Sequence, residues 1–232
     1  GPIRALAPGA AVKLPVNARA FVKFGQNHMQ TAVFINPIAQ PDICTAAGDI
    51  GCNRNCAGLT GLGNDVGGDR ITICEDTNAD SKADKFTEFA TEQSLTTGIT
   101  KVKGGIIVAQ APNMVFLEDT DGDDQMDKST ILFDGFGIWD THAGPSSLRY
   151  GIDNMIWGAV GYSGFENQFQ NKSVSFKMGV YRFAKDGSYF EPVGQFNNNT
   201  WGLGFNESFE IFGSTANNNH AIYVGIPLKH YD

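Results

Sequence analysis

Two acidic segments with one shared pattern lie 43 residues apart, and this internal repeat constrains the fold more than any other feature. Ile71–Lys85 aligns with Met114–Lys128, and in both segments an Asp-rich loop joins two short runs of β-forming residues. A repeat of roughly 40–50 residues with about four strands per unit is typical of the blades of a β-propeller. The repeat therefore predicts an all-β chain built from such blades.

The rest of the chain favours the same class, because short β-rich runs alternate with turn residues and helical periodicity is almost absent. At 43 residues per blade, residues 65–232 hold about four blades of a partial β-propeller. Residues 1–64 add an initial strand at Ala20–Phe24 and a Cys-rich loop insertion. Because four blades rarely close a ring well, we expect a further chain or a C-terminal segment to complete the propeller. The chain is then the N-terminal part of a larger protein or of an assembly.

The four cysteines are Cys44, Cys52, Cys56 and Cys74, and the first three lie in a Gly- and Asn-rich stretch. Their spacing lacks the paired C-x2-C knuckles of common zinc sites, although a zinc site is the alternative. We interpret the cysteines as two disulfides that pin a long loop, with all three pairings open. Disulfides form in oxidising compartments, so we expect a secreted or periplasmic protein.

The charge pattern excludes one class of partner. The formal net charge is −8, and the 17 Lys and Arg residues are scattered without a basic stripe. A nucleic-acid partner would need a clustered basic face, so we expect none. No apolar run approaches the roughly 20 residues of a membrane helix, so we also expect no transmembrane segment. Much of the acidic excess lies in the two Asp-rich loops, where carboxylates that repel one another need a cation among them.

Both loops have the pattern D-x-[DN]-x-D-x-x-x-D, which predicts calcium sites because calcium prefers several oxygen ligands. The expected ligands are side chains at positions 1, 3, 5 and 9 and a backbone carbonyl at position 7. They are Asp76, Asn78, Asp80, Lys82 and Asp84 in the first loop, and Asp119, Asp121, Asp123, Gln125 and Asp127 in the second. Position 12 is a threonine in both loops, so neither is an EF-hand. The alternative is an acidic, solvated turn, which Asp, Asn and Gly favour for their own reasons.

Seven short segments within residues 65–232 resemble those of a known family. They are Arg70–Thr77, Gly105–Pro112, Phe116–Asp123, Gly135–Gly137 with Asp140–His142, Trp201–Phe205 and Gly213–Asn219. They resemble the membrane-bound dehydrogenase domain that is abundant in planctomycete-type bacteria and is related to the soluble quinoprotein glucose and sorbosone dehydrogenases. The resemblance implies a six-bladed β-propeller that binds pyrroloquinoline quinone and oxidises a sugar or an alcohol.

The resemblance also implies roles for two residues. His142 stands where those dehydrogenases have the histidine that acts as general base on the substrate hydroxyl, a task that suits a neutral imidazole near pH 7. Asn199 resembles the asparagine of their cofactor-binding motif. Without the resemblance, the interpretation of His142 is a hydrogen-bonded polar residue at the end of a strand, with no catalytic role.

The sequence departs from the family at positions that contact the cofactor. Asn198 and Trp201 stand where the cofactor motif has arginine and glutamine, and Ser147 stands where an arginine follows the histidine motif. In the family, the cations that clamp the quinone carboxylates come from later blades. Two functions therefore remain open: a quinone-dependent sugar or alcohol dehydrogenase, and a non-catalytic extracellular binding or assembly module stabilised by calcium.

Overall fold

The computed structural model describes residues 69–75, 77–78, 83–169 and 171–231, together with the strand backbone at 19–24 and 30–36. The prediction of an all-β chain is confirmed, because β-strands dominate these residues and their one helical element is the 3-10 turn η1 (Leu228–His230). Within the described residues we find no helix that is long and apolar enough to span a membrane.

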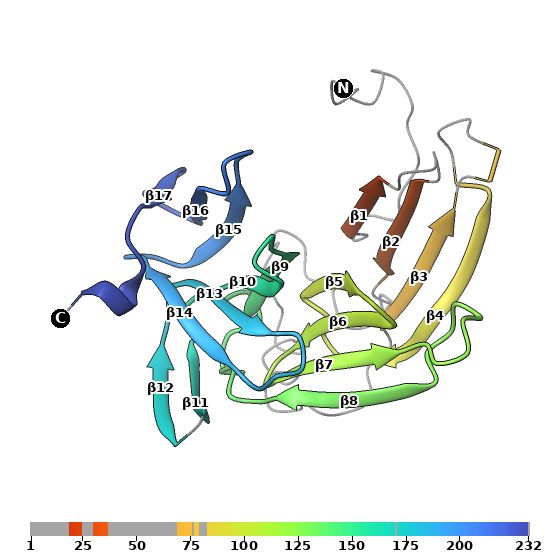
Figure 1. The fold of residues 1–232 in the computed structure, drawn as a ribbon, viewed down its shortest axis with the longest axis horizontal. Helices are drawn as coiled ribbons and strands as arrows, with labels where there is room; N and C mark the ends of the chain where they lie inside the picture. The colour runs from red at the N-terminus through yellow and green to blue at the C-terminus, as the bar shows by residue number, and fades with distance from the viewer. Residues whose placement is uncertain are drawn as a thin grey trace, which may run out of the picture.

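The strands pair in antiparallel sheets that follow one another round an arc in chain order (Figure 1). The first sheet contains β1 (Arg19–Phe24), β2 (Gln30–Asn36), β3 (Asp69–Glu75) and β4 (Lys85–Gln93). The second contains β5 (Gly98–Val102), β6 (Gly105–Gln110), β7 (Asn113–Glu118) and β8 (Lys128–Phe133). The third contains β9 (Pro145–Tyr150), β10 (Met155–Val160), β13 (Gly179–Ala184) and β14 (Phe190–Gln195). The fourth contains β15 (Thr200–Phe205), β16 (Ile211–Thr215) and β17 (Ile222–Val224).

The second sheet is apolar on both faces. In β6, Ile106 and Val108 belong to a buried cluster shared with the first sheet, whereas Ile107 and Ala109 belong to a cluster shared with the third. Successive side chains of a strand point to opposite faces, so a strand buried on both sides reads as an unbroken apolar run. The third sheet is built in the same way, and a further cluster joins it to the fourth. The sheets therefore stack face to face.

A hairpin of β11 (Phe165–Phe169) and β12 (Lys172–Phe176) is inserted between β10 and β13. Its Phe165 ring stacks on Phe190 of β14, with ring centroids 4.1 Å apart and an interplanar angle of 9°. The insertion lengthens the third unit, so the 43-residue spacing relates the first two sheets only. There, β3 and β4 correspond to β7 and β8, and the two Asp-rich loops join equivalent strands.

An ion network fastens η1 to the third sheet. Arg182 of β13 lies 3.0 Å from Asp153 and 2.6 Å from Glu191, and Lys229 of η1 lies 3.2 Å from Glu191. Glu191 is only 6% exposed. Burial raises the pKa of this carboxyl, but the hydrogen bonds from the two cations outweigh burial and leave the pKa below its usual value. Glu191 therefore stays ionised although it is buried.

The fourth sheet buries only one face in the described part of the chain. Ile211 and Val224 pack toward the third sheet. Phe212 and Tyr223 lie on the other face, with 38% and 57% of their surfaces exposed and ring centroids 5.5 Å apart. This face, which we call the outer aromatic face, exposes these two aromatic rings.

The region before residue 69 is described only in β1 and β2. The first of these covers the predicted initial strand, and β2 pairs with β3 from Thr31 to Asn36. Residues from both sides of the predicted division at residue 64 thus contribute to one sheet. Cys74 in β3 has a buried, free thiol whose pKa is raised to about 11 by burial. Two disulfides would need all four cysteines, so the free thiol of Cys74 contradicts that prediction. Cys44, Cys52 and Cys56 lie outside the described residues.

Glycine at position 158 is required by the packing of the third sheet. A methyl group there would lie 2.5 Å from the ring of Tyr181, the fully buried residue of β13 that pairs with Gly158. We expect Gly158→Ala to lower the free energy of unfolding by about 1–3 kcal/mol, the usual cost of overpacking a core. Gly204 of β15 is the control, since a methyl group there meets no atom within 4 Å and Gly204→Ala should stay within about 0.5 kcal/mol of wild type. Urea unfolding of both variants measures this; equal stabilities would contradict the packing described.

Candidate functional site

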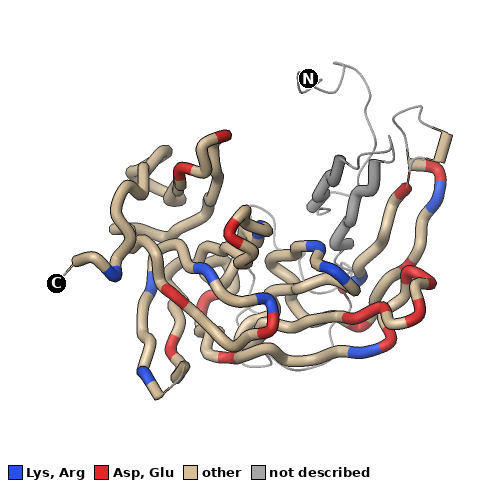
Figure 2. The backbone as a smooth tube through the Cα atoms, viewed as in Figure 1, with Lys and Arg blue, Asp and Glu red and all other residues tan. Residues whose placement is uncertain are grey.

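The second Asp-rich loop joins β7 to β8 and gathers three carboxylates. Ligand oxygens of Asp119, Asp121 and Asp127 lie within 4.8 Å of one another, so this cluster could hold a metal ion. Asp123 makes different contacts, because the backbone N–H and the side-chain amide of Gln125 both donate to its carboxylate at 2.8 Å. The loop thus brings together three of the side chains predicted from its sequence. Figure 2 shows the acidic residues gathered at this end of β7 and β8.

Backbone and hydroxyl donors fix the carboxylates of this loop. Asp119 accepts the N–H groups of Gly122 at 2.7 Å and of Asp124 at 3.2 Å. Asp127 accepts the hydroxyl of Thr120 at 2.6 Å and its backbone N–H at 2.7 Å. These two hydrogen bonds, the hydroxyl first, lower the pKa of Asp127 below its usual value. Asp127 is therefore held ionised, as a metal ligand must be.

The first Asp-rich loop repeats part of this arrangement. Asp84 accepts the backbone N–H and the hydroxyl of Thr77, both at 3.0 Å, and these bonds lower the pKa of Asp84. Thr77 and Asp84 are the counterparts of Thr120 and Asp127, 43 residues earlier. Among the other predicted ligands of this loop, Asn78 is described, whereas Asp76, Asp80 and Lys82 lie outside the described residues. The metal site predicted there stays a prediction.

Both loops are closed at their base by an equivalent ion pair. Lys85 Nζ lies 2.7 Å from Glu75 Oε2, and Lys128 Nζ lies 2.7 Å from Glu118 Oε2. Each pair joins the last residue of one strand to the first residue of the next. The repeat seen in the sequence therefore extends to the contacts that close the loops.

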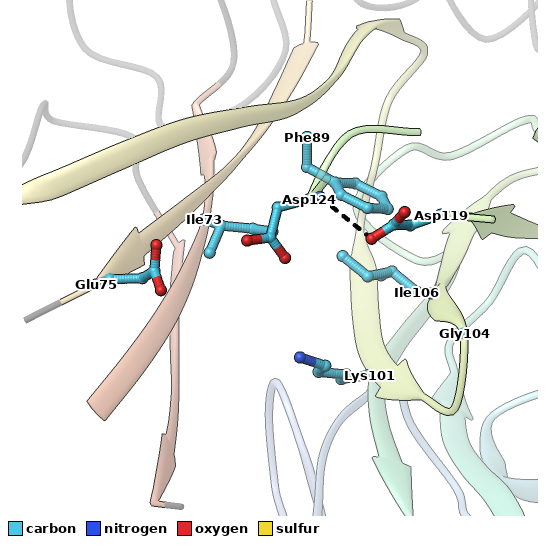
Figure 3. Close-up of a pocket in the computed structure, with 9 residues that line it drawn as sticks. Ile73, Glu75, Phe89, Lys101, Gly104, Ile106, Asp119 and Asp124 are labelled. Carbon is cyan, nitrogen blue, oxygen red and sulfur yellow. Dashed lines mark hydrogen bonds between the residues drawn. The ribbon is translucent and has the colours of Figure 1, made fainter. Parts of the chain in front are cut away.

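A cavity of about 270 Å³ lies between the first two sheets, beside the second Asp-rich loop (Figure 3). Its lining combines apolar side chains with acidic ones and one lysine: Ile73, Phe89, Ile106, Glu75, Asp119, Asp124 and Lys101. Next to it, the backbone N–H of Met126 donates to the carbonyl of Phe89 in β4 at 2.8 Å. The loop is thus bonded to the first sheet as well as to the strands that it joins.

His142 lies in the loop between β8 and β9, with 43% of its side chain exposed. Asp140, two residues earlier, accepts the backbone N–H of His142 on Oδ1 at 2.9 Å. The same oxygen lies 3.6 Å from Nδ1 of the imidazole. The predicted base is therefore accessible to solvent and adjacent to a carboxylate.

Gly161 brings the His142 loop and Asn199 together, although these two residues are 57 positions apart. Its N–H donates to the carbonyl of Ala143 at 3.0 Å, and the next residue, Tyr162, donates its N–H to Asn199 Oδ1 at 3.2 Å. A methyl group on Gly161 would lie 1.7 Å from Asn199 Oδ1 and 3.0 Å from Ala143 Cα. Only glycine lets the three segments meet, and we call their meeting point the Gly161 junction.

The Gly161 junction and the second Asp-rich loop lie at opposite ends of the strands. The Asp-rich loop precedes β8 and the His142 loop follows it. Six residues of extended strand span about 20 Å. Any chemistry at His142 is therefore separated from a metal ion held by the Asp cluster.

The cofactor-motif positions are occupied by internal contacts. Asn198 Oδ1 accepts the Tyr162 hydroxyl at 2.6 Å and the Asn199 backbone N–H at 2.7 Å. Ser147 donates its hydroxyl to the Trp201 carbonyl at 3.2 Å. None of these positions offers a cation, whereas the carboxylates of pyrroloquinoline quinone need cationic partners. The described residues on their own do not fit this cofactor.

Three residues that shape this region were not assigned a role from sequence: Asp140, Gly161 and Tyr162. The sequence could have indicated a role for Asp140, because it lies only two positions before His142. Gly161 and Tyr162 follow a buried strand in a Gly-rich turn, which gives no indication of the segments they contact. Their role depends on contacts between distant parts of the chain.

Residues 57–231 match the family described as a domain of unknown function, DUF7133, and the chain belongs to this family. No curated protein matches the sequence. The chain is similar to an X-ray structure described as a gluconolactonase, with a TM-score of 0.41 and 14% identity over 68% of this chain and 59% of that chain. It is also similar to a structure described as a glucose dehydrogenase, with a TM-score of 0.40 and 10% identity over 68% of this chain and 56% of that one. The chain thus spans less than two thirds of either structure.

The hydrogen bond from the Thr120 hydroxyl to Asp127 predicts how the stability of the protein depends on pH. The pKa of Asp127 is lower in the folded protein than in the unfolded chain, where it is about 4. Ionised Asp127 therefore stabilises the folded state above about pH 4, and this stabilisation is lost as the pH falls through the pKa of the folded state. In metal-free buffer, Thr120→Val should raise the pKa of Asp127 in a carbon-13 NMR titration, although the backbone donor keeps part of the effect. The stability difference from wild type should be present above about pH 5 and shrink in more acidic solution. Thr130→Val in β8 is the control; an unchanged Asp127 pKa in Thr120→Val would refute the assignment.

Proposed function

We propose that the chain is part of a calcium-stabilised β-propeller that oxidises a sugar or an alcohol, with His142 as the general base. The observation that carries this proposal is the Gly161 junction, which joins the loop of His142 to Asn199. The family resemblance assigns His142 to catalysis and Asn199 to cofactor binding. Family membership alone carries no activity, so the proposal rests on these residues.

Calcium is the metal we propose for the second Asp-rich loop. Carboxylate oxygens are hard ligands that calcium prefers over nitrogen or sulfur donors. The three clustered side chains, Asp119, Asp121 and Asp127, supply carboxylates only. The ion would offset their mutual repulsion and hold β7, β8 and the first sheet together through the loop. We extend the same proposal to the first loop on the basis of its matching hydrogen bonds.

The chemical step that this chain contributes is proton removal. The imidazole of His142 takes the proton from a substrate hydroxyl group, and its exposure gives a substrate access. Asn199, held at the Gly161 junction, would orient the reacting group. We propose pyrroloquinoline quinone as the family's hydride acceptor, but the described residues do not hold it, so no step is derived through it.

We propose that a further chain or a C-terminal segment completes the propeller and supplies the missing cations. The outer aromatic face of the fourth sheet supports this. Phe212 and Tyr223 present there the kind of surface that the other sheets bury against a neighbour. A further blade that covered this face would extend the stack in the same manner.

The second candidate function is a non-catalytic binding or assembly module stabilised by calcium. The engagement of Asn198 by Tyr162 and the absence of a cation at the described cofactor-motif positions favour it. For either function we propose a secreted or periplasmic location, because a disulfide within the Cys-rich insertion would need an oxidising compartment.

Calcium should raise the thermal stability of the protein. A ligand that binds the folded state only, at a hundredfold excess over its Kd, stabilises that state by about 2.7 kcal/mol. We expect the calcium-dependent rise in Tm to be lost in Asp121→Asn with Asp127→Asn, which removes two of the three clustered carboxylates. Asp124→Asn is the matched control, since this residue lies in the same loop but outside the cluster. A Tm that does not respond to calcium or chelator would sink the calcium proposal.

His142 should be needed for turnover. The full protein, reconstituted with pyrroloquinoline quinone and calcium, should reduce a dye in the presence of a sugar or alcohol from a substrate panel. His142→Gln should lower kcat by about 10²–10⁴-fold, the range for loss of a general base. His230→Gln, in η1, should keep full activity. Failure to bind quinone and absence of turnover in the wild type would reject the dehydrogenase proposal in favour of the binding module.

A further inference from the structure

We propose that Asp140 is a positioning residue for His142, which holds the neutral imidazole as the tautomer with the proton on Nδ1. The basic lone pair is then on Nε2, the nitrogen farther from the loop backbone. This inference rests on the proposed function, since it concerns the same general base. It assigns a role to Asp140, which was part of the family resemblance but was given no role there.

The carboxylate of Asp140 lies beside Nδ1 of the His142 imidazole. Asp140 Oδ1 lies 3.6 Å from His142 Nδ1, within ion-pair range but longer than a hydrogen bond. Such contacts between catalytic groups are often long in the absence of substrate and tighten when it binds. The tautomer of a histidine is set by the partner of one ring nitrogen, and a carboxylate beside Nδ1 favours the proton there.

The turn that carries both residues is held rigidly in place. The Asp140 carbonyl accepts the Ser163 hydroxyl at 2.7 Å and the Ala143 backbone N–H at 3.1 Å. Ala143 in turn accepts the backbone N–H of Ser163 at 3.2 Å. Ser163 and Ala143 are 8% and 1% exposed, so these bonds are shielded from water. The backbone of Asp140 is therefore fixed relative to the Gly161 junction.

A simpler role must be separated from this one. Asp140 also accepts the backbone N–H of His142, the usual turn-stabilising bond of Asp and Asn. Asn at position 140 would keep that bond and remove the charge. A residue that only stabilises the turn would thus be replaced by Asn without effect on the imidazole.

Nitrogen-15 NMR of the histidine rings tests the proposal without cofactor or substrate. In the wild type above the pH at which the ring is charged, His142 should be mainly the Nδ1–H tautomer. In Asp140→Asn the ratio of Nδ1–H to Nε2–H should fall about two- to fivefold, the size expected for an exposed charge contact. Asp140→Ala should show at least the same fall. The rings of His220 and His230 in the same spectra are internal controls and should not change.

Two results would overturn the proposal. One is a wild-type His142 that is mainly Nε2–H. The other is an unchanged tautomer ratio in Asp140→Asn with the backbone amide shifts of residues 140–143 preserved, which would leave Asp140 a turn residue only. The ratio is measured on the ring itself, so a protein without dehydrogenase activity would still confirm or refute this proposal.

Discussion

The second and third sheets bury both of their faces, and this requirement determines where the other parts of the chain can lie. Ile106 and Ile107 are neighbours in β6, yet they enter different apolar clusters because successive side chains point to opposite faces. Each such sheet must be covered on both sides, at a gain of about 25 cal/mol for each Å² of apolar surface buried. The Asp-rich loops and the His142 loop lie at the ends of the strands, outside these packed faces.

The two ends of the strands carry different chemistry. At one end, Asp127 is held ionised by Thr120, and Met126 bonds the loop to Phe89 of the first sheet. At the other end, Gly161 allows backbone segments to approach so closely that Asn199 and the His142 loop share one hydrogen-bonded junction. Carboxylates that repel one another need a cation, whereas a base needs access and orientation. The length of the strands separates the acidic cluster from the His142 loop.

Much of the fold could be predicted from local sequence. The alternation of apolar residues and turn residues located the strands, and the 43-residue repeat identified β3–β4 and β7–β8 as equivalent pairs. The inserted β11–β12 hairpin was missed, because its place depends on the stacking of Phe165 against Phe190 of a later strand. Asp123 was placed among the ligands by its spacing. It accepts two hydrogen bonds from Gln125 in the structure, and its role as a ligand stays a prediction. The Gly161 junction could not be predicted from local sequence, because the segments that meet there come from three separate loops.

Amide hydrogen exchange with and without calcium tests most directly the claim that the two ends act separately. The account predicts that calcium slows exchange across residues 118–128 and leaves residues 140–144, 161–163 and 196–199 unchanged. Protection of both ends to a similar degree would contradict it, because the ion would then be coupled to the His142 region. Absence of any protection at 118–128 would contradict the role of the Asp-rich loop itself.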